Sequence, residues 1–196
     1  SSGRIGNLMY NYAILTNLES DHLDYHKNIK NYHLAKVNLI KNHKLKNSIL
    51  FLQDDKLKNK FKSFKSKLFT QGKFLSNHKI SVTQKKNDKF QISTNNFLFN
   101  ISSFNNFMVK NIITILMIYH NITKQFPLNI SNSLFPPGRS EIIFNKKNKA
   151  IIIDYAHSKD AYENLLKELP SNKNIIIVYG CGGDRDKTKR PQIAKV

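Results

Sequence analysis

The feature that most constrains the fold is an apolar run, Ile175–Tyr179, that leads directly into the glycine-rich segment Gly180–Gly183 and then into alternating charges. An apolar strand that ends in glycines is how open α/β sheets present loops to ligands at the carboxyl ends of their strands. We therefore predict an α/β fold with a binding loop beyond this strand. The loop does not match a phosphate-binding P-loop, because that motif needs Gly directly before its Lys-Thr pair and here Asp186 precedes Lys187.

The charges in this loop favour an amino-acid ligand over a nucleotide. Two carboxylates, Asp184 and Asp186, flank Arg185 and would repel a triphosphate. The guanidinium of Arg185 offers a planar fork to a carboxylate, while the two acids can receive a cationic amine. The alternative interpretation is an exposed charged loop that only connects two elements.

Three further polar segments occur earlier in the chain, at Thr16–His26, Gly138–Glu141 and Asp154–His157. In this order, and together with Gly180–Pro191, they resemble the diamino-acid-adding members of the Mur ligase family. They are similar to the metal loop of that family's central domain, the entry to its third domain, its nucleotide-sugar motif and its amino-acid loop. The resemblance spans nearly the whole chain apart from a variable middle.

This resemblance implies an ATP-dependent ligase of peptidoglycan precursor synthesis. Family members of this type add a diamino acid, meso-diaminopimelate or L-lysine, to UDP-MurNAc-L-Ala-D-Glu. The implied cofactors are ATP and Mg²⁺, and the implied reaction forms an acyl phosphate on the D-glutamate γ-carboxylate, which the diamino acid's amine then attacks. The alternatives are another ligase of the superfamily, such as a folylpolyglutamate or cyanophycin synthetase, and a basic protein that binds nucleic acid.

The resemblance also implies how the chain is organised. Residues 1–136 are similar to part of a central ATP-binding domain, an open, mostly parallel sheet with a β-meander, and residues 137–196 to the start of a Rossmann-like C-terminal domain. The 196 residues begin at Ser1 and contain no G-x-x-x-x-G-K-[ST] phosphate loop. We therefore expect an internal fragment, or the product of a truncated gene, that is inactive alone.

Two residues are candidates for holding the metal. The acids and imidazoles at Asp21–His26 could simply cap the following helix, and without cysteines they give only a weak zinc pattern. The resemblance instead implies that His22 binds Mg²⁺. Lys36 reads on its own as a solvated surface lysine, but it matches the family lysine that carbon dioxide converts to a carbamate, whose oxygens suit Mg²⁺.

The other candidate residues also rest on the resemblance. Asn111 would contact the adenine, Arg139 the phosphates and Asp154 the ribose hydroxyls. Met108 stands where the family has a first asparagine in this helix, which departs from the pattern. Arg4 is similar to the arginine that binds the UDP-muramoyl substrate, and Arg185 to the one that holds the carboxylate of the incoming amino acid.

The composition of the chain argues against some classes of function rather than for one. The chain has 32 Lys plus Arg against 13 Asp plus Glu, a formal charge of +19. Nearly all of the excess is lysine spread along the chain, whereas a nucleic-acid binder is expected to use arginine and interleaved aromatics. We therefore predict no specific nucleic-acid partner.

A single cysteine, Cys181, excludes an intrachain disulfide, and no apolar run approaches membrane-spanning length. These features fit a cytoplasmic monomer acting on small molecules.

Apolar spacing predicts the following elements. Strands are expected at Tyr12–Leu18, Ser48–Leu52 and Asn174–Tyr179, a meander at Ile80–Thr83, Phe90–Ser93 and Phe97–Ile101, and a hairpin at Glu141–Phe144 and Ala150–Asp154. Helices are expected at Ile29–Ile40, Lys56–Lys67, Phe107–Tyr119 and Asp160–Leu169. The third helix is apolar almost all round and is predicted to be buried.

Overall fold

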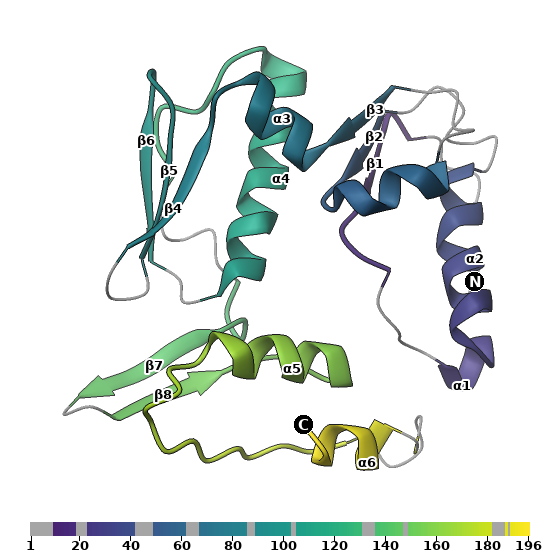
Figure 1. Cartoon of the computed structure of the whole chain (residues 1–196), viewed down its shortest axis with the longest axis vertical. Coiled ribbons are helices and arrows are strands. Elements are labelled where there is room, and N and C mark those ends of the chain that lie inside the picture. The colour runs from purple at the N-terminus through teal and green to yellow at the C-terminus, as the bar shows by residue number, and fades with distance from the viewer. Residues whose placement is uncertain are drawn as a thin grey trace.

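The computed structural model describes residues 10–18, 23–41, 49–61, 67–85, 89–102, 105–130, 136–146, 149–181, 187 and 189–196. It forms a mixed α/β fold with one parallel and two antiparallel sheets (Figure 1). Three candidate residues, Arg4, His22 and Arg185, lie outside the described residues. In the part of the chain that is described, no helix is long and apolar enough to cross a membrane.

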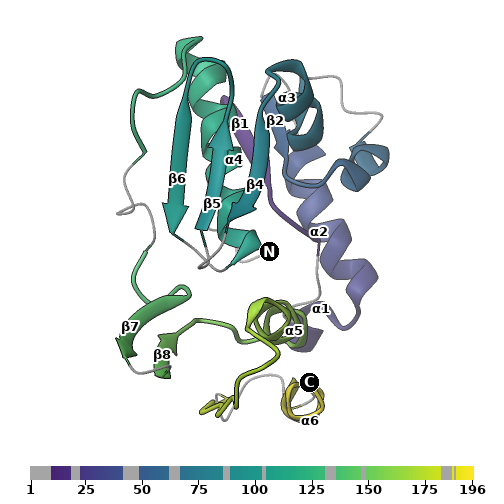
Figure 2. The same cartoon turned by 60° about the vertical axis from the view of Figure 1, so that its left-hand side comes forward.

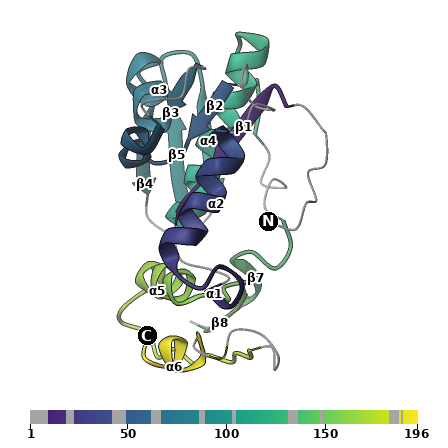
Figure 3. The same cartoon turned by 90° about the vertical axis from the view of Figure 1, so that its right-hand side faces the viewer.

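The parallel sheet confirms the predicted central architecture. Its strands β1 (Tyr12–Leu15), β2 (Ile49–Leu52) and β3 (Leu68–Thr70) pair in that order. The connection from β1 to β2 contains α1 (Leu23–His26) and α2 (Ile29–Lys41), and α2 runs across the sheet (Figure 3). The middle strand is fully buried, since its residues 50–52 are 0% exposed, as is typical of a strand covered on both faces.

Two short elements differ from the sequence prediction. The basic helix predicted at Lys56–Lys67 is instead the 3-10 helix η2 (Asp55–Phe61), in which Leu57 and Phe61 are buried. The Asp54 carboxylate accepts a hydrogen bond from the backbone N–H of Lys56 at 2.9 Å, which closes a tight turn at the start of this helix. The strand β3 and the helix α3 (Gln71–Asn77) were not predicted, because three strand residues are too few to show a period.

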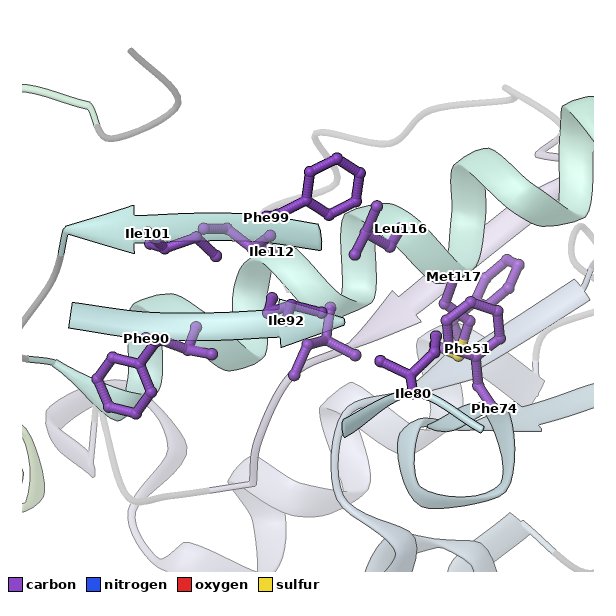
Figure 4. Packing of buried hydrophobic residues seen from close by; sticks show 12 residues of the cluster. Phe51, Phe74, Ile80, Phe90, Ile92, Phe99, Ile101, Ile112, Leu116 and Met117 are labelled. Carbon is purple, nitrogen blue, oxygen red and sulfur yellow. The ribbon is translucent and has the colours of Figure 1, made fainter. Parts of the chain in front are cut away.

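The predicted meander is confirmed as an antiparallel sheet of β4 (Ser81–Lys85), β5 (Lys89–Ser93) and β6 (Leu98–Ser102). Alternate side chains of β5 and β6 face inward and pack on the helix α4 (Asn106–Thr123), which lies behind the sheet in Figure 2, whereas the residues of β4 are exposed. The predicted burial of this helix all round is confirmed only on the side that faces the sheets, because Ile115 and Tyr119 on the other side are 50% and 40% exposed. Figure 4 shows the resulting core, in which side chains of α4 meet those of β5, β6 and Phe51 of β2.

The remaining residues form a hairpin and two helices. The predicted hairpin is confirmed as β7 (Glu141–Lys146) and β8 (Lys149–Ile153), and the predicted helix as α5 (Lys159–Glu168), while α6 (Lys189–Ala194) lies near the C-terminus. The strand predicted at Asn174–Tyr179 is wrong: this segment is extended but joins no sheet of the described residues. Ile176 and Val178 are 91% and 95% exposed, because no described strand lies beside them to cover them.

Candidate functional site

Polar side chains gather where the parallel strands end. Gln53 follows β2 and Gln71 follows β3, and both are buried, at 7% and 6% exposure. Gln53 donates from Nε2 to Oδ1 of Asn111 at 2.9 Å, and Gln71 donates from Nε2 to the backbone oxygen of Lys110 at 2.8 Å. Buried amides that are paired in this way avoid the cost of burying an unsatisfied polar group. They hold one face of α4 against the carboxyl edge of the sheet.

Asn111 is oriented by this contact. Its Oδ1 accepts from Gln53, so its Nδ2 group is left to donate elsewhere, and Nδ2 has no partner among the described residues. The side chain is half-buried. Met108, one turn earlier on α4, is 8% exposed and belongs to the apolar side of the helix. Asn111 is therefore an available hydrogen-bond donor beside the apolar side of α4.

The turn before β7 is organised around Asp154, which directly follows β8. Ser140 donates to Oδ2 of Asp154 from its backbone N–H at 2.8 Å and from its hydroxyl at 3.1 Å, and Ala156 donates from its N–H to Oδ1 at 2.7 Å. Gly138 and Ser140 adopt positive φ angles of 73° and 51°, which tighten the turn. A carboxylate offers about four acceptor sites, so three hydrogen bonds leave room for one further donor.

The N-terminus of α4 connects to this turn. Asn105 caps α4 by accepting from the N–H of Phe107 at 2.8 Å, and it donates from Nδ2 to the hydroxyl of Ser140 at 2.9 Å. Asn106 donates to Oε2 of Glu168, at the end of α5, from its backbone N–H at 3.3 Å and from Nδ2 at 3.0 Å. Figures 1 and 2 both show this end of α4 beside β7 and α5. We call the series Asn105–Ser140–Asp154 the junction network.

The junction network brings two of the candidates into one neighbourhood. Asn111 lies five residues after Asn106 on α4, about 8 Å along the helix at 1.5 Å per residue. Asp154 is joined to the start of the same helix through Ser140 and Asn105. A ligand that contacts both Asn111 and Asp154 would therefore have to extend along α4 from Asn111 to the N-terminus of the helix.

Arg139 sits in the same turn and is exposed. Its guanidinium carbon lies 4.4 Å from the centre of the Tyr155 ring. Stacking on an aromatic face orients the guanidinium while leaving its N–H groups free to bind an anion. This arrangement suits a phosphate contact near Asp154.

The segment before the glycine-rich loop lies beside α5. The rings of Tyr162 on α5 and Tyr179 have centres 5.9 Å apart. Burial raises the pKa of Tyr162, with further contributions from Cys181, Tyr179 and Asp154. The described end of this segment therefore lies beside Tyr162 of α5, and the loop that contains Arg185 follows outside the described residues.

Lys36, on α2, reaches the segment that follows β1. Its Nζ donates to the backbone oxygen of Asn17 at 3.4 Å and lies 4.6 Å from the centre of the Tyr32 ring. The side chain is half-buried rather than fully solvated. Asn17 belongs to the segment that leads into the predicted metal loop, whose His22 is not described. The structure thus places Lys36 beside this loop's entry, and among the described residues its contacts are with Asn17 and Tyr32 rather than with Asn111 or Asp154.

Within the described ranges, no group of three or more His, Cys, Asp or Glu side chains could hold a metal ion. A hollow between α5 and α6, lined by Lys159, Glu163, Gln192, Lys195 and Val196, contains none of the candidate residues. His157 makes a local contact, its Nδ1 lying 3.0 Å from the backbone oxygen of Tyr155. The polar groups of interest are therefore those along the strand ends and the junction network.

Sequence reasoning did not single out Gln53, it considered Asn105 only as a residue that could replace the asparagine missing at Met108, and it named Ser140 only as part of the segment Gly138–Glu141. A signal for Gln53 was available, because it is the first polar residue after an apolar strand, the position at which ligand loops begin in α/β sheets. Asn105 also carries a signal, since Asn is a favoured N-cap before an apolar helix. The link from Asn105 to Ser140 joins residues 35 positions apart and has no local sequence signature.

Comparison with known proteins identifies what the chain is similar to. The family described as "Mur ligase middle domain" matches residues 1–118, and "Mur ligase, glutamate ligase domain" matches residues 138–196. Proteins named UDP-N-acetylmuramoyl-L-alanyl-D-glutamate–2,6-diaminopimelate ligase are similar in sequence. Those of Fusobacterium nucleatum, Clostridium perfringens and Lawsonia intracellularis are 31%, 34% and 35% identical over 99%, 98% and 98% of this chain. The chain spans 42%, 43% and 43% of their lengths.

Solved structures support the fold. The MurF ligase from Thermotoga maritima in complex with ADP matches with a TM-score of 0.63 at 20% identity, covering 85% of this chain and 40% of that one. A mutant of the L. casei protein FPGS matches with a TM-score of 0.50 at 18% identity, covering 82% of this chain and 43% of that one. At these identities the likeness concerns the fold alone.

Proposed function

This chain belongs to the Mur ligase family, and from that premise we propose that it forms part of an ATP-dependent ligase that adds a diamino acid to UDP-MurNAc-L-Ala-D-Glu. The names of the relatives, at 31% to 35% identity, support 2,6-diaminopimelate as the diamino acid. The observation that carries the proposal is the junction network, which joins Asp154 to the start of the helix that bears Asn111. We also propose the domain border near residue 136, just before the turn that this network holds.

In this proposal the nucleotide lies along α4 and the junction network. Asn111 donates from Nδ2 to the adenine, because Gln53 already occupies its Oδ1. Asp154 accepts one ribose hydroxyl at its remaining acceptor site. Arg139, stacked on Tyr155, pairs with a phosphate. Each role uses a hydrogen-bonding capacity that the described contacts leave open.

We propose that His22 and a carbamate on Lys36 hold Mg²⁺. The position of Lys36 fits this role, since its amine is half-buried and lies beside a backbone oxygen at the end of β1. Oxygen donors are the ligands that Mg²⁺ prefers. His22 rests on the family resemblance, because nitrogen is an unusual ligand for this cation.

When bound, magnesium ATP supplies the phosphoryl group that converts the D-glutamate γ-carboxylate into an acyl phosphate for attack by the diamino acid's amine. The chain's own groups position the reactants and offset charge rather than form a covalent bond. Arg4 would bind the UDP-muramoyl substrate, and Arg185 would pair bidentately with the carboxylate of the diamino acid. No described contact favours a folylpolyglutamate-type ligase or a nucleic-acid binder.

A chimeric enzyme tests the proposal. In it, these 196 residues replace the matching segment of the Fusobacterium nucleatum relative. We expect ADP formation that requires both UDP-MurNAc-L-Ala-D-Glu and meso-diaminopimelate, and a loss of about 100-fold or more with Lys36→Ala. A folded chimera that binds ATP but forms no ADP with both substrates present would contradict the proposed activity.

The same chimera separates the amino-acid site from the nucleotide site. Arg185→Lys keeps the charge but loses the bidentate geometry, a loss of about 1.5 to 3 kcal/mol for a charge-assisted pair. The KM for meso-diaminopimelate should rise while the KM for ATP stays unchanged. A raised KM for ATP with an unchanged KM for meso-diaminopimelate would instead mean that Arg185 binds the nucleotide.

A further inference from the structure

One buried polar atom in the described part of the chain lacks a partner. The Nε2 atom of His33, on α2, is buried and has no hydrogen bond. Leaving a buried donor or acceptor unsatisfied is costly, and such atoms are rare in folded proteins. His33 lies on the face of α2 that contains Tyr32, Val37 and Ile40, which is the side turned toward the core. A group that arrives only in the functional state would explain the orphaned nitrogen.

The neighbouring Lys36 is where such a group would form. Helical side chains point toward the N-terminus, so Lys36 extends over the preceding turn, which carries Tyr32 four positions earlier and His33 three positions earlier. At present the ammonium lies over the Tyr32 ring at 4.6 Å and donates to the oxygen of Asn17 at 3.4 Å. Both contacts suit a cation, because an aromatic face and a carbonyl oxygen are both electron-rich.

Carbamylation would reverse the charge at this position. The unprotonated Nζ attacks the carbon of CO₂, a new N–C bond forms, one C=O π pair moves onto oxygen, and the nitrogen releases a proton to water. The product is an anion with two acceptor oxygens. Neither the face of Tyr32 nor the Asn17 oxygen can stabilise it, so the end of the side chain must turn toward a hydrogen-bond donor.

We propose that His33 is that donor: in its Nε2–H tautomer it binds a carbamate oxygen on Lys36 and positions the modified side chain. His33 and Lys36 are three residues apart on one helix, a spacing at which side chains are neighbours. Val37 and Ile40 on the same face are apolar and cannot replace it. This inference rests on the proposed carbamylation of Lys36, and it makes His33 a positioning residue rather than a catalytic one.

Carbamate occupancy can be measured without enzyme activity. The 196-residue chain is equilibrated with carbon-13 bicarbonate, and the carbamate resonance is recorded by carbon-13 NMR. Lys36→Arg identifies the signal of Lys36, because a guanidinium does not form the carbamate. His33→Phe removes the donor but keeps a ring, and His33→Gln keeps a donor. His78→Phe is the matched control, since His78 is also half-buried but packs against Phe74 and Phe126 instead.

We expect His33→Phe to reduce the occupancy of the Lys36 carbamate about ten-fold, the effect of one charge-assisted hydrogen bond. His33→Gln should keep most of the signal, and His78→Phe should match the unsubstituted chain. Backbone amide spectra of each variant check that the fold is retained, and should His33→Phe not fold, the comparison of His33→Gln with His33→Leu replaces it. An unchanged signal in the variant without a donor overturns the role of His33 alone. A chain in which Lys36→Arg removes no signal overturns the carbamylation of Lys36 as well.

Discussion

Residues 10–130 and residues 136–196 contain the same kind of apolar strand, but they bury it to very different extents. In the first region, strands of both sheets pack against α4, and side chains such as Phe51 and Ile92 are 0% exposed. In the second, Ile193 is the one buried hydrophobic residue among those described. Ile151 of β8 and Phe144 of β7 remain 53% and 41% exposed. Apolar strand residues in this chain are therefore buried where other strands and a helix pack against them, and stay exposed in the two-stranded hairpin.

The two regions differ in burial because their strands have different numbers of neighbouring strands and helices. A two-stranded hairpin such as β7–β8 is marginal in water, whereas three strands with a helix on one face are stable. The second region is instead held to the first by polar contacts, from Asn105 to Ser140 and from Asn106 to Glu168. Hydrogen bonds of this kind each contribute about 1 kcal/mol, much less than a shared core. The proposed nucleotide residues lie along this polar boundary.

The largest expected effect on the free energy of unfolding comes from replacing phenylalanine by alanine, which we compare between the two regions. Phe51→Ala should lower the free energy of unfolding by about 3 to 5 kcal/mol, because a fully buried ring leaves a cavity in the core. Phe144→Ala, at a ring that is 41% exposed, should cost well under half as much. Urea unfolding followed by circular dichroism measures both. Equal losses would show that the second region has a core of its own.

The next effect concerns the strand-end amides. Gln53→Met should cost about 1 to 3 kcal/mol, because it removes a buried amide and leaves the half-buried oxygen of Asn111 without its donor. Gln91→Met is the matched control, since Gln91 makes the same kind of bond to Asn100 at 3.3 Å on the exposed side of the meander, and it should cost about 0.5 kcal/mol or less. Similar losses for both variants would mean that Gln53 does not hold α4 to the sheet edge.

A smaller effect with the opposite sign is expected at His33. His33→Phe removes the buried nitrogen that has no partner, so it should raise the free energy of unfolding by about 1 kcal/mol. His157→Phe, at an exposed ring that contacts the Tyr155 oxygen, should give no gain. The melting temperatures of the two variants report this directly. A destabilised His33→Phe chain would mean that the imidazole already has a favourable environment.

The smallest effect is a pH dependence of the first region. Burial lowers the pKa of His120 below its ordinary value of 6.5, with further lowering by His78 and Lys124. As the pH drops below 6.5, His120 is protonated in the unfolded chain before it is protonated in the folded chain. The unfolded chain then binds more protons, so the free energy of unfolding should decrease as the pH drops below 6.5. His120→Asn should flatten the dependence of the urea midpoint on pH. The prediction would be contradicted if the urea midpoint of the unsubstituted chain increased as the pH dropped and this increase were absent in His120→Asn.

The sequence predicted those elements whose signals are local. The apolar spacing of α4, the meander and the hairpin needed no knowledge of distant partners, and all three were confirmed. The strand at Asn174–Tyr179 failed because a strand requires a neighbour, and its local pattern cannot report whether one is present. In the candidate site, Asn111 and Asp154 were proposed from motifs, but Gln53 contacts Asn111 across 58 positions of sequence and only the folded chain shows this contact.

The most direct test of the account is nucleotide affinity along α4. In the chimera, Asn111→Leu should weaken binding of a non-hydrolysable ATP analogue by about ten-fold or more, measured by isothermal titration calorimetry, because the adenine loses its donor. Asn129→Leu, at an exposed residue beyond α4, is the control and should leave the affinity unchanged. Equal affinities for the two variants, with both folded, would contradict the claim that the strand ends and the junction network form a nucleotide site.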